Sequence, residues 1–137
     1  MILVSACLAG INCNYKGEHK ANKKVMELVK NNEAVTVCPE QLGGLPTPRI
    51  PVEIIDGKAI RKDGVDVTDE FQQGARKTLE KCIQHGCKKA ILKSFSPSCG
   101  CGKIYDGTFT GTVIDGDGFT TKLLKQHGIE VVSSDDI

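Results

Sequence analysis

The chain contains 137 residues, with 18 Lys and Arg against 17 Asp and Glu, so its formal net charge is +1. This balance excludes a general electrostatic attraction to nucleic acid or anionic lipid, so we expect any substrate to be recognised locally. No apolar run approaches the roughly 18 residues of a membrane span, and no leader pattern is visible. We therefore expect a cytoplasmic protein with a single domain over residues 1–137.

The seven cysteines do not have the pattern of a disulfide framework. Their number is odd, and no export signal points to an oxidising compartment. In a reducing cytosol, cysteines serve as core residues, nucleophiles or metal ligands. Each cysteine is therefore interpreted from its place in the predicted fold.

Short apolar runs predict four strands, and periodic apolar positions predict three helices between them. The strands are expected at 2–6, 34–37, 89–93 and 129–132. The helices are expected at 21–30, 69–85 and 117–125. The longest helix is expected to face the core through one apolar stripe, which consists of Phe71, Ala75, Leu79, Cys82 and Ile83. We expect Asp66 or Thr68 to cap this helix and Asp117 to cap the last one.

The alternation of strands and helices predicts an α/β fold, a three-layer sandwich with a mostly parallel four-stranded sheet. Residues 52–55 and 58–60 flank Asp56-Gly57 and are expected to form a small hairpin outside that sheet. Residues 38–51 contain four prolines and two glycines, which argues against a regular helix or a central strand. We expect this segment to form a rigid loop over the sheet's crevice, and we expect residues 104–113 to be polar and rich in turns.

Three thiols follow three of the predicted strands, at Cys7, Cys38 and Cys99. The carboxyl ends of parallel strands meet at one edge of a sheet, where ligands bind, so the three thiols are expected to converge there. Buried cysteines also occur as small hydrophobic residues, but three at equivalent positions favour a metal or cluster site. Three cysteine ligands would leave one coordination position open on zinc, or one iron of a [4Fe-4S] cluster free. The residues alone do not distinguish zinc from iron.

The other four cysteines have different interpretations. Cys82 lies on the apolar stripe of its helix and is expected in the core, and Cys87 is expected to be structural. Cys101 forms either a chelate or redox pair with Cys99, or an ordinary loop thiol. The five residues between Cys7 and Cys13 do not match a standard zinc or ferredoxin spacing, so Cys13 is not included among the ligands.

Five polar residues near these thiols are candidates for catalysis or substrate binding. Glu40 closely follows Cys38, and a desolvated carboxylate there could act as a general base rather than as a solvated loop residue. Ser96 and Ser98 could stabilise turns or hydrogen-bond the substrate. Lys93 and Arg49 could hold a carbonyl group or an anion, or could be surface charges.

Four motifs, in this order, resemble one family along nearly the whole chain. They are Cys7-Leu-Ala-Gly10, Cys38-Pro-Glu40 with Gly43-Gly-Leu-Pro-Thr-Pro-Arg49, Ser96-Pro-Ser-Cys-Gly100 and Tyr105-Asp-Gly-Thr-Phe109. The chain is thus similar to the small bacterial domain family, formerly of unknown function, that includes the iron-sulfur thiouracil desulfidases. This resemblance implies a [4Fe-4S] cluster held by only Cys7, Cys38 and Cys99, with one open iron that binds the sulfur of a thiolated nucleobase. It also implies removal of sulfur from 2-thiouracil-like substrates, with release of sulfide and the oxo base.

These observations lead to the hypothesis of a cluster-dependent, non-redox desulfidase that acts on a small thiolated base and whose cluster can be absent from an aerobic preparation. Glu40 would activate a water molecule, and Ser98 or Ser96 would orient the substrate or the leaving sulfur. A non-catalytic metal-binding or redox-sensing module is the first alternative. A metal-free thiol enzyme that uses Cys99 and Cys101 is the second.

Overall fold

The computed structural model describes residues 1–137 and contains one four-stranded, entirely parallel sheet. Across the sheet, the strands follow the order β2 (Ala34–Val37), β1 (Ile2–Ser5), β5 (Lys89–Leu92) and β8 (Glu130–Ser133). The predicted strands lie within one residue of these bounds at either end. The predicted α/β class and parallel sheet are therefore confirmed.

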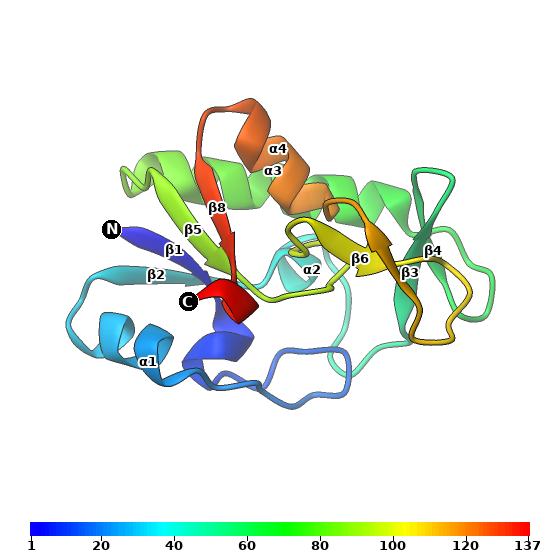
Figure 1. Cartoon of the computed structure of the whole chain (residues 1–137), viewed down its shortest axis with the longest axis horizontal. Coiled ribbons are helices and arrows are strands. Elements are labelled where there is room, and N and C mark those ends of the chain that lie inside the picture. Colours follow the sequence, from blue (N-terminus) through cyan, green and yellow to red (C-terminus); the bar gives the residue numbers. More distant parts are fainter.

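Helices cover both faces of the sheet and complete the three layers (Figure 1). Helix α1 (Lys23–Lys30) lies against one face, and helices α3 (Thr68–Gln84) and α4 (Phe119–Gln126) lie against the other. Successive residues of a strand point to opposite faces, so Leu3 packs in the core under α3 and α4, whereas Val4 packs beside α1. No helix combines the length and apolar character that crossing a membrane requires.

Two antiparallel hairpins extend from the sheet. The first pairs β3 (Val52–Ile55) with β4 (Lys58–Arg61), as predicted. Its turn residues Asp56 and Gly57 both have positive φ angles, 51° and 76°, as the type I′ turn of a two-residue hairpin requires. The second pairs β6 (Lys103–Tyr105) with β7 (Val113–Asp115) and was not predicted, because its strands are short and all three residues of β7 are exposed.

The structure of residues 38–51 differs in one respect from the prediction. It begins with a short helix, α2 (Pro39–Leu42), where the sequence indicated only an irregular loop. Pro39 is compatible with this helix because it occupies the first turn, where the amide donors have no partner within the helix. The proline therefore starts the helix, and Gly43 ends it.

The predicted caps and one core residue are also corrected. Val67 is the N-cap of α3 without a side-chain cap, and Asp66 instead accepts a hydrogen bond from the Thr68 amide. Gly118 is the N-cap of α4. Asp117 accepts from the Gly102 amide and pairs with Lys125. Ile83 is 64% exposed, because its position at the end of the α3 stripe faces solvent rather than the sheet.

Helices α2 and α3 cross with their backbones in close contact at two glycines. A Cβ atom on Gly74 of α3 would overlap the Pro39 carbonyl, and a Cβ atom on Gly43 would overlap the Glu70 carbonyl. Each helix thus approaches the other at one of its own glycines, where no side chain separates the two backbones. This contact fixes the depth at which α2 lies against α3.

We expect Gly74→Ala to lower the free energy of unfolding by about 2 kcal/mol or more. The overlap with a backbone carbonyl outweighs the roughly 1 kcal/mol by which alanine favours a helix over glycine. Urea denaturation would measure the change, with the exposed α3 substitution Gln72→Ala as the control. A Gly74→Ala protein as stable as the parent would show that α2 moves away without cost.

Candidate functional site

Two candidate thiols lie at the carboxyl ends of two adjacent strands, the edge strand β2 and its inner neighbour β1. Cys7 is in the 3-10 helix η1 (Ala6–Ala9) directly after β1, and Cys38 is the N-cap of α2 directly after β2. Cys99 lies in the turn-rich loop that follows β5, six residues beyond Lys93. Cys7 and Cys99 are buried, and Cys38 is half-buried. The parallel sheet thus brings the three thiols to one edge, as its topology predicts.

Cys13 is a fourth thiol in this region, and it interacts with both Cys7 and Cys38. The Cys38 Sγ donates to the Cys13 carbonyl oxygen at 3.6 Å. Hydrogen bonding with Cys38 lowers the pKa of Cys13, but interaction with Cys7 and burial raise it more, to about 11. Hydrogen bonding with Cys13 and then burial raise the pKa of Cys38 well above its ordinary value. The spacing of Cys7 and Cys13 in the sequence gave no indication that Cys13 interacts with these two thiols.

Cys99 lies beside Ser98 and Ser5. Ser98 Oγ is 3.7 Å from Cys99 Sγ. Burial raises the pKa of the Cys99 thiol to about 11, although hydrogen bonding with Ser5 and Ser98 acts in the opposite direction. Electrostatic interaction with Glu40 and Cys38 contributes to the rise. A carboxylate and a second thiol are therefore close enough to Cys99 to affect its ionisation.

Glu40, on helix α2, is bound on both carboxylate oxygens. Arg49 Nε donates to its Oε1 at 2.9 Å, and Ser98 Oγ donates to its Oε2 at 2.8 Å. The Glu40 side chain is 13% exposed and the Arg49 side chain is 6% exposed. A charge pair this shielded depends on both partners, because removal of either leaves an uncompensated charge.

Two serines form a short hydrogen-bond chain that ends at Glu40. Ser96 Oγ accepts from the amides of Ser98 and Cys99 at 3.2 and 3.1 Å, which holds the loop around it. The two hydroxyl oxygens lie 3.0 Å apart. Because Ser98 uses its proton on Glu40, the bond between the serines is donated by Ser96. The sequence predicted both serines near the site, but it did not predict the contact of Ser98 with Glu40.

Arg49 connects three segments of the site through its guanidinium group. Besides Glu40, it donates from Nη2 to the Cys13 carbonyl at 2.9 Å and from Nη1 to Thr47 Oγ1 and the Pro46 carbonyl at 3.0 and 3.2 Å. Its three nitrogens all have partners within the protein. The predicted contact between Arg49 and substrate therefore stays a prediction, and the observed contacts give it a positioning role.

Lys93 lies at the end of β5 but outside this network. Its amide donates to Ser5 Oγ at 2.9 Å, and its Nζ contacts Ser94 Oγ at 3.0 Å and the Ser94 carbonyl at 3.3 Å. Neither Glu40 nor Ser98 contacts this ammonium group. A role for Lys93 in substrate binding stays a prediction.

The remaining cysteines lie apart from these thiols. Cys82 is fully buried and donates from Sγ to the Cys87 carbonyl at 3.3 Å, so its predicted place in the core is confirmed. Cys101 is half-buried, and its Sγ donates to the Val131 carbonyl in β8 at 3.5 Å. That contact directs the Cys101 sulfur toward the edge strand, and no bond joins it to Cys99.

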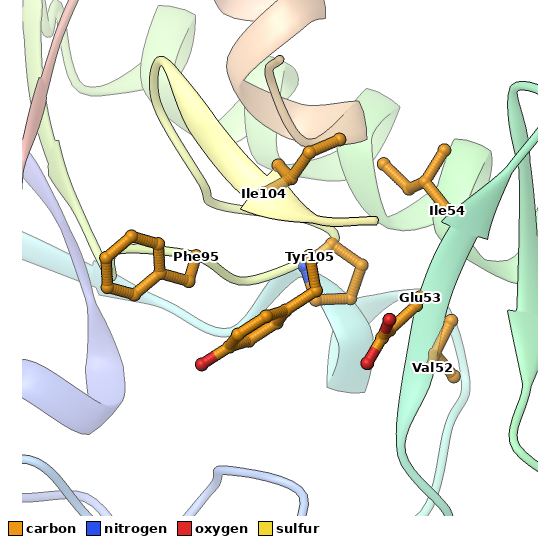
Figure 2. Close-up of a pocket in the computed structure, with 7 residues that line it drawn as sticks. Val52, Glu53, Ile54, Phe95, Ile104 and Tyr105 are labelled. Atoms are coloured by element: carbon orange, nitrogen blue, oxygen red, sulfur yellow. The ribbon is translucent and has the colours of Figure 1, made fainter. Parts of the chain in front are cut away.

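A shallow pocket without room for a water molecule lies between the hairpins and the segment after β5. Figure 2 shows the residues that line it, which are Val52, Glu53, Ile54, Phe95, Pro97, Ile104 and Tyr105. No candidate thiol is among them. Buried Glu53 accepts from the Gly107 and Phe109 amides at 2.9 and 3.1 Å. The sequence gave no signal for this residue, whose role is to anchor the loop after β6.

Phe95 and Tyr105 meet at one end of this pocket, with their ring centroids 5.8 Å apart. Phe95 has a φ of 63°, a conformation that is strained for a bulky side chain. Strain of this kind occurs where the surrounding structure holds a residue in place. Here the ring contact and a backbone bridge to Ile104 hold the start of the Ser96–Cys99 loop.

No group of three or more His, Cys, Asp or Glu side chains is gathered tightly enough to hold a single metal ion. The fold and its thiols nevertheless define the class: an α/β protein with a cysteine-rich candidate metal centre at the carboxyl edge of a parallel sheet. The 2-thiouracil desulfurase family model matches residues 2–136. The chain belongs to this family.

Two relatives resemble the chain over nearly its full length. The "Uncharacterized protein YbbK" of Bacillus subtilis (strain 168) is 47% identical, in a match that covers 100% of this chain and 97% of that protein. A solved structure, titled [4Fe-4S]-dependent thiouracil desulfidase TudS, is 44% identical and superposes with a TM-score of 0.94. That match covers 99% of this chain and 91% of the other. The family resemblance inferred from the four motifs is therefore confirmed.

The donor set present here fits a sulfur-ligated cluster. Thiolates are the ligands that iron-sulfur clusters and zinc prefer, and the site offers thiols from three adjacent strands. A cluster contains several iron atoms, so its ligands do not need to point at one atom as the ligands of a single ion do. The carboxylate next to Cys99 adds a group suited to proton transfer.

Proposed function

We propose that the chain is a [4Fe-4S]-dependent desulfidase that replaces the sulfur of a thiolated nucleobase, such as 2-thiouracil, with oxygen and releases sulfide. Family membership and the likeness to the structure titled as a desulfidase support this proposal. The observation that carries it is the shielded Glu40 carboxylate, joined through Ser98 to the surroundings of Cys99. A sensor needs thiols, but it does not need a positioned base beside them.

We assign Cys7, Cys38 and Cys99 as the ligands of the cluster. All three must lose their protons to bind iron, so loading the cluster releases protons. When bound, the cluster would supply an open iron that accepts the substrate's sulfur and polarises the carbon–sulfur bond. Cys13 and Cys101 are not part of this set.

Glu40 is the proposed general base. Its carboxylate would take a proton from the water that attacks the substrate carbon, at the Oε2 atom that now accepts from Ser98. Arg49 fixes the orientation of the carboxylate through Nε. The overall exchange consumes water and yields the oxo base and hydrogen sulfide, so it needs no external electrons.

The two serines and the lysine have proposed supporting roles. Ser98 would orient the substrate or the leaving sulfur, since its hydroxyl lies between Glu40 and the Cys99 sulfur. Ser96 would hold Ser98 in place through the bond between their hydroxyls. Lys93 would reach the substrate only by leaving its contacts with Ser94.

The chain, reconstituted anaerobically with iron and sulfide and freed of excess reagents, is expected to convert 2-thiouracil to uracil without an added reductant. Each uracil formed should be matched by one sulfide, because hydrolysis changes no oxidation state. Chromatography of the bases together with a sulfide assay would measure both, with the cluster-free chain as control. An intact cluster that produces no uracil would instead favour a metal-binding or redox-sensing module.

A further inference from the structure

Cys13 is a buried thiol that the proposed desulfidase reaction does not use. Its side chain is only 2% exposed, and it packs in the same apolar cluster as Cys7, with Cys38 against that cluster. The Cys38 Sγ reaches the Cys13 carbonyl at 3.6 Å, and the two thiols interact directly. One of the three proposed cluster ligands thus has a neighbouring thiol with no other chemical assignment.

The loop around Cys13 is held in this position from two sides. Arg49 donates from Nη2 to the Cys13 carbonyl at 2.9 Å, and the Arg49 amide donates to the Tyr15 carbonyl at 2.8 Å. Within the loop, the Cys13 amide donates to the Ile11 carbonyl at 2.9 Å. These bonds connect the Cys13 loop to the segment that begins at Cys38, so the nearness of the two thiols does not depend on a cluster between them.

The two thiols differ in their access to solvent. Cys38 is half-buried, whereas Cys13 is almost completely covered. Of these two sulfurs, a small hydroperoxide in solution therefore reaches that of Cys38 first once no cluster protects it, and the raised pKa of this thiol makes its oxidation slow. Cys7 also interacts with Cys13, but it is buried as well, which makes it a poorer first target.

We propose that Cys13 is a resolving thiol that protects the cluster ligand Cys38 from irreversible oxidation when the cluster is absent. Hydrogen peroxide oxidises the Cys38 thiol by two electrons to a sulfenic acid and is itself reduced to water. The Cys13 thiol then attacks this sulfur, the sulfur–oxygen bond breaks, and a second water leaves as the Cys13–Cys38 disulfide forms. A thiol reductant returns both residues to the reduced state, whereas a sulfinic acid on Cys38 would be permanent without a dedicated enzyme.

Peptide mapping of the cluster-free chain tests this directly. The reduced chain would be treated with hydrogen peroxide, alkylated with N-ethylmaleimide, digested with trypsin and analysed by mass spectrometry. Trypsin places Cys13 in residues 1–16 and Cys38 in residues 31–49, so the disulfide links these two peptides. Cys7 shares the first peptide, and fragment ions that show N-ethylmaleimide on Cys7 identify Cys13 as the linked residue.

Three variants make the assignment specific. The link should be lost in Cys13→Ser and in Cys13→Ala, and it should persist in Cys7→Ser. With excess peroxide, Cys38 in the Cys13 variants should gain two oxygen atoms, whereas Cys38 in the parent should not. Circular dichroism would confirm that each variant is folded. A link between Cys7 and Cys13, or equal formation of sulfinic acid on Cys38 with and without Cys13, would overturn the proposal.

The effect of this oxidation on cluster binding rests on the proposed function, and a separate experiment measures it. After peroxide treatment and then dithiothreitol, the parent should recover full uptake of iron and sulfide, and Cys13→Ser should lose most of it. If even the untreated, reduced parent bound no cluster, the proposed function would fail. The peptide map would still decide the role of Cys13, because it requires no cluster.

Discussion

Glu40→Gln is expected to slow desulfidation of 2-thiouracil by about 100-fold or more, the usual scale of a general base, without loss of the cluster. The amide has nearly the same shape as the carboxylate, but it cannot take a proton from water. Single-turnover rates at matched cluster content would measure the effect, because they separate the chemical step from product release. Equal rates for the two proteins would remove Glu40 from the mechanism.

The same substitution also affects stability, so it needs a matched control. Glu40→Gln leaves the shielded Arg49 without its carboxylate, which is costly in a buried position. Glu53→Gln provides the comparison, because Glu53 is also a buried carboxylate with two donors but lies away from the thiols. Both variants should unfold at lower temperature than the parent, and only Glu40→Gln should lose the reaction.

Replacement of Cys7, Cys38 or Cys99 by alanine is expected to abolish stable cluster binding. Each change removes one of only three proposed ligands, and the neighbouring thiol of Cys13 is not part of this set. Iron and sulfide content after anaerobic reconstitution, together with the visible absorption of the cluster, would measure the loss. A Cys7→Ala protein that reconstitutes as fully as the parent would contradict the ligand set.

Cys82→Ala provides the control for the loss of a buried sulfur. Cys82 belongs to α3 and its side chain is fully buried, so the substitution leaves a small cavity and should cost about 1 kcal/mol of stability. Its cluster content should match that of the parent. If Cys82→Ala also lost the cluster, the losses in the ligand variants would reflect unfolding rather than missing ligands.

The sequence was sufficient to predict the sheet and the positions of the three thiols. Apolar strands followed by cysteines are local patterns, and a parallel sheet brings the ends of its strands together by topology alone. Helix α2 was missed because prolines and glycines dominate its surroundings, although Pro39 is well suited to a first turn. The β6–β7 hairpin was missed because its strands are too short to produce an alternating pattern.

The contacts within the site could not be predicted in the same way. Ser98 is 58 residues from Glu40, and Arg49 is 36 residues from the Cys13 carbonyl that it binds. Such pairings depend on how separate loops pack, and no spacing in the sequence encodes them. The residue types therefore identified Glu40, Arg49 and Ser98 as candidates, while their hydrogen bonds required the structure.

The glycine crossing of α2 and α3 limits how this site can change. Cys38 and Glu40 belong to the start of one four-residue helix, so any movement of that helix moves the proposed ligand and the proposed base together. Because Gly43 and Gly74 leave no room for inward movement, the helix also cannot sink toward α3 to enlarge the site. Selection for a bulkier substrate would therefore have to alter the loop around Arg49 or the segment that carries Ser96 and Ser98, with the helix left unchanged.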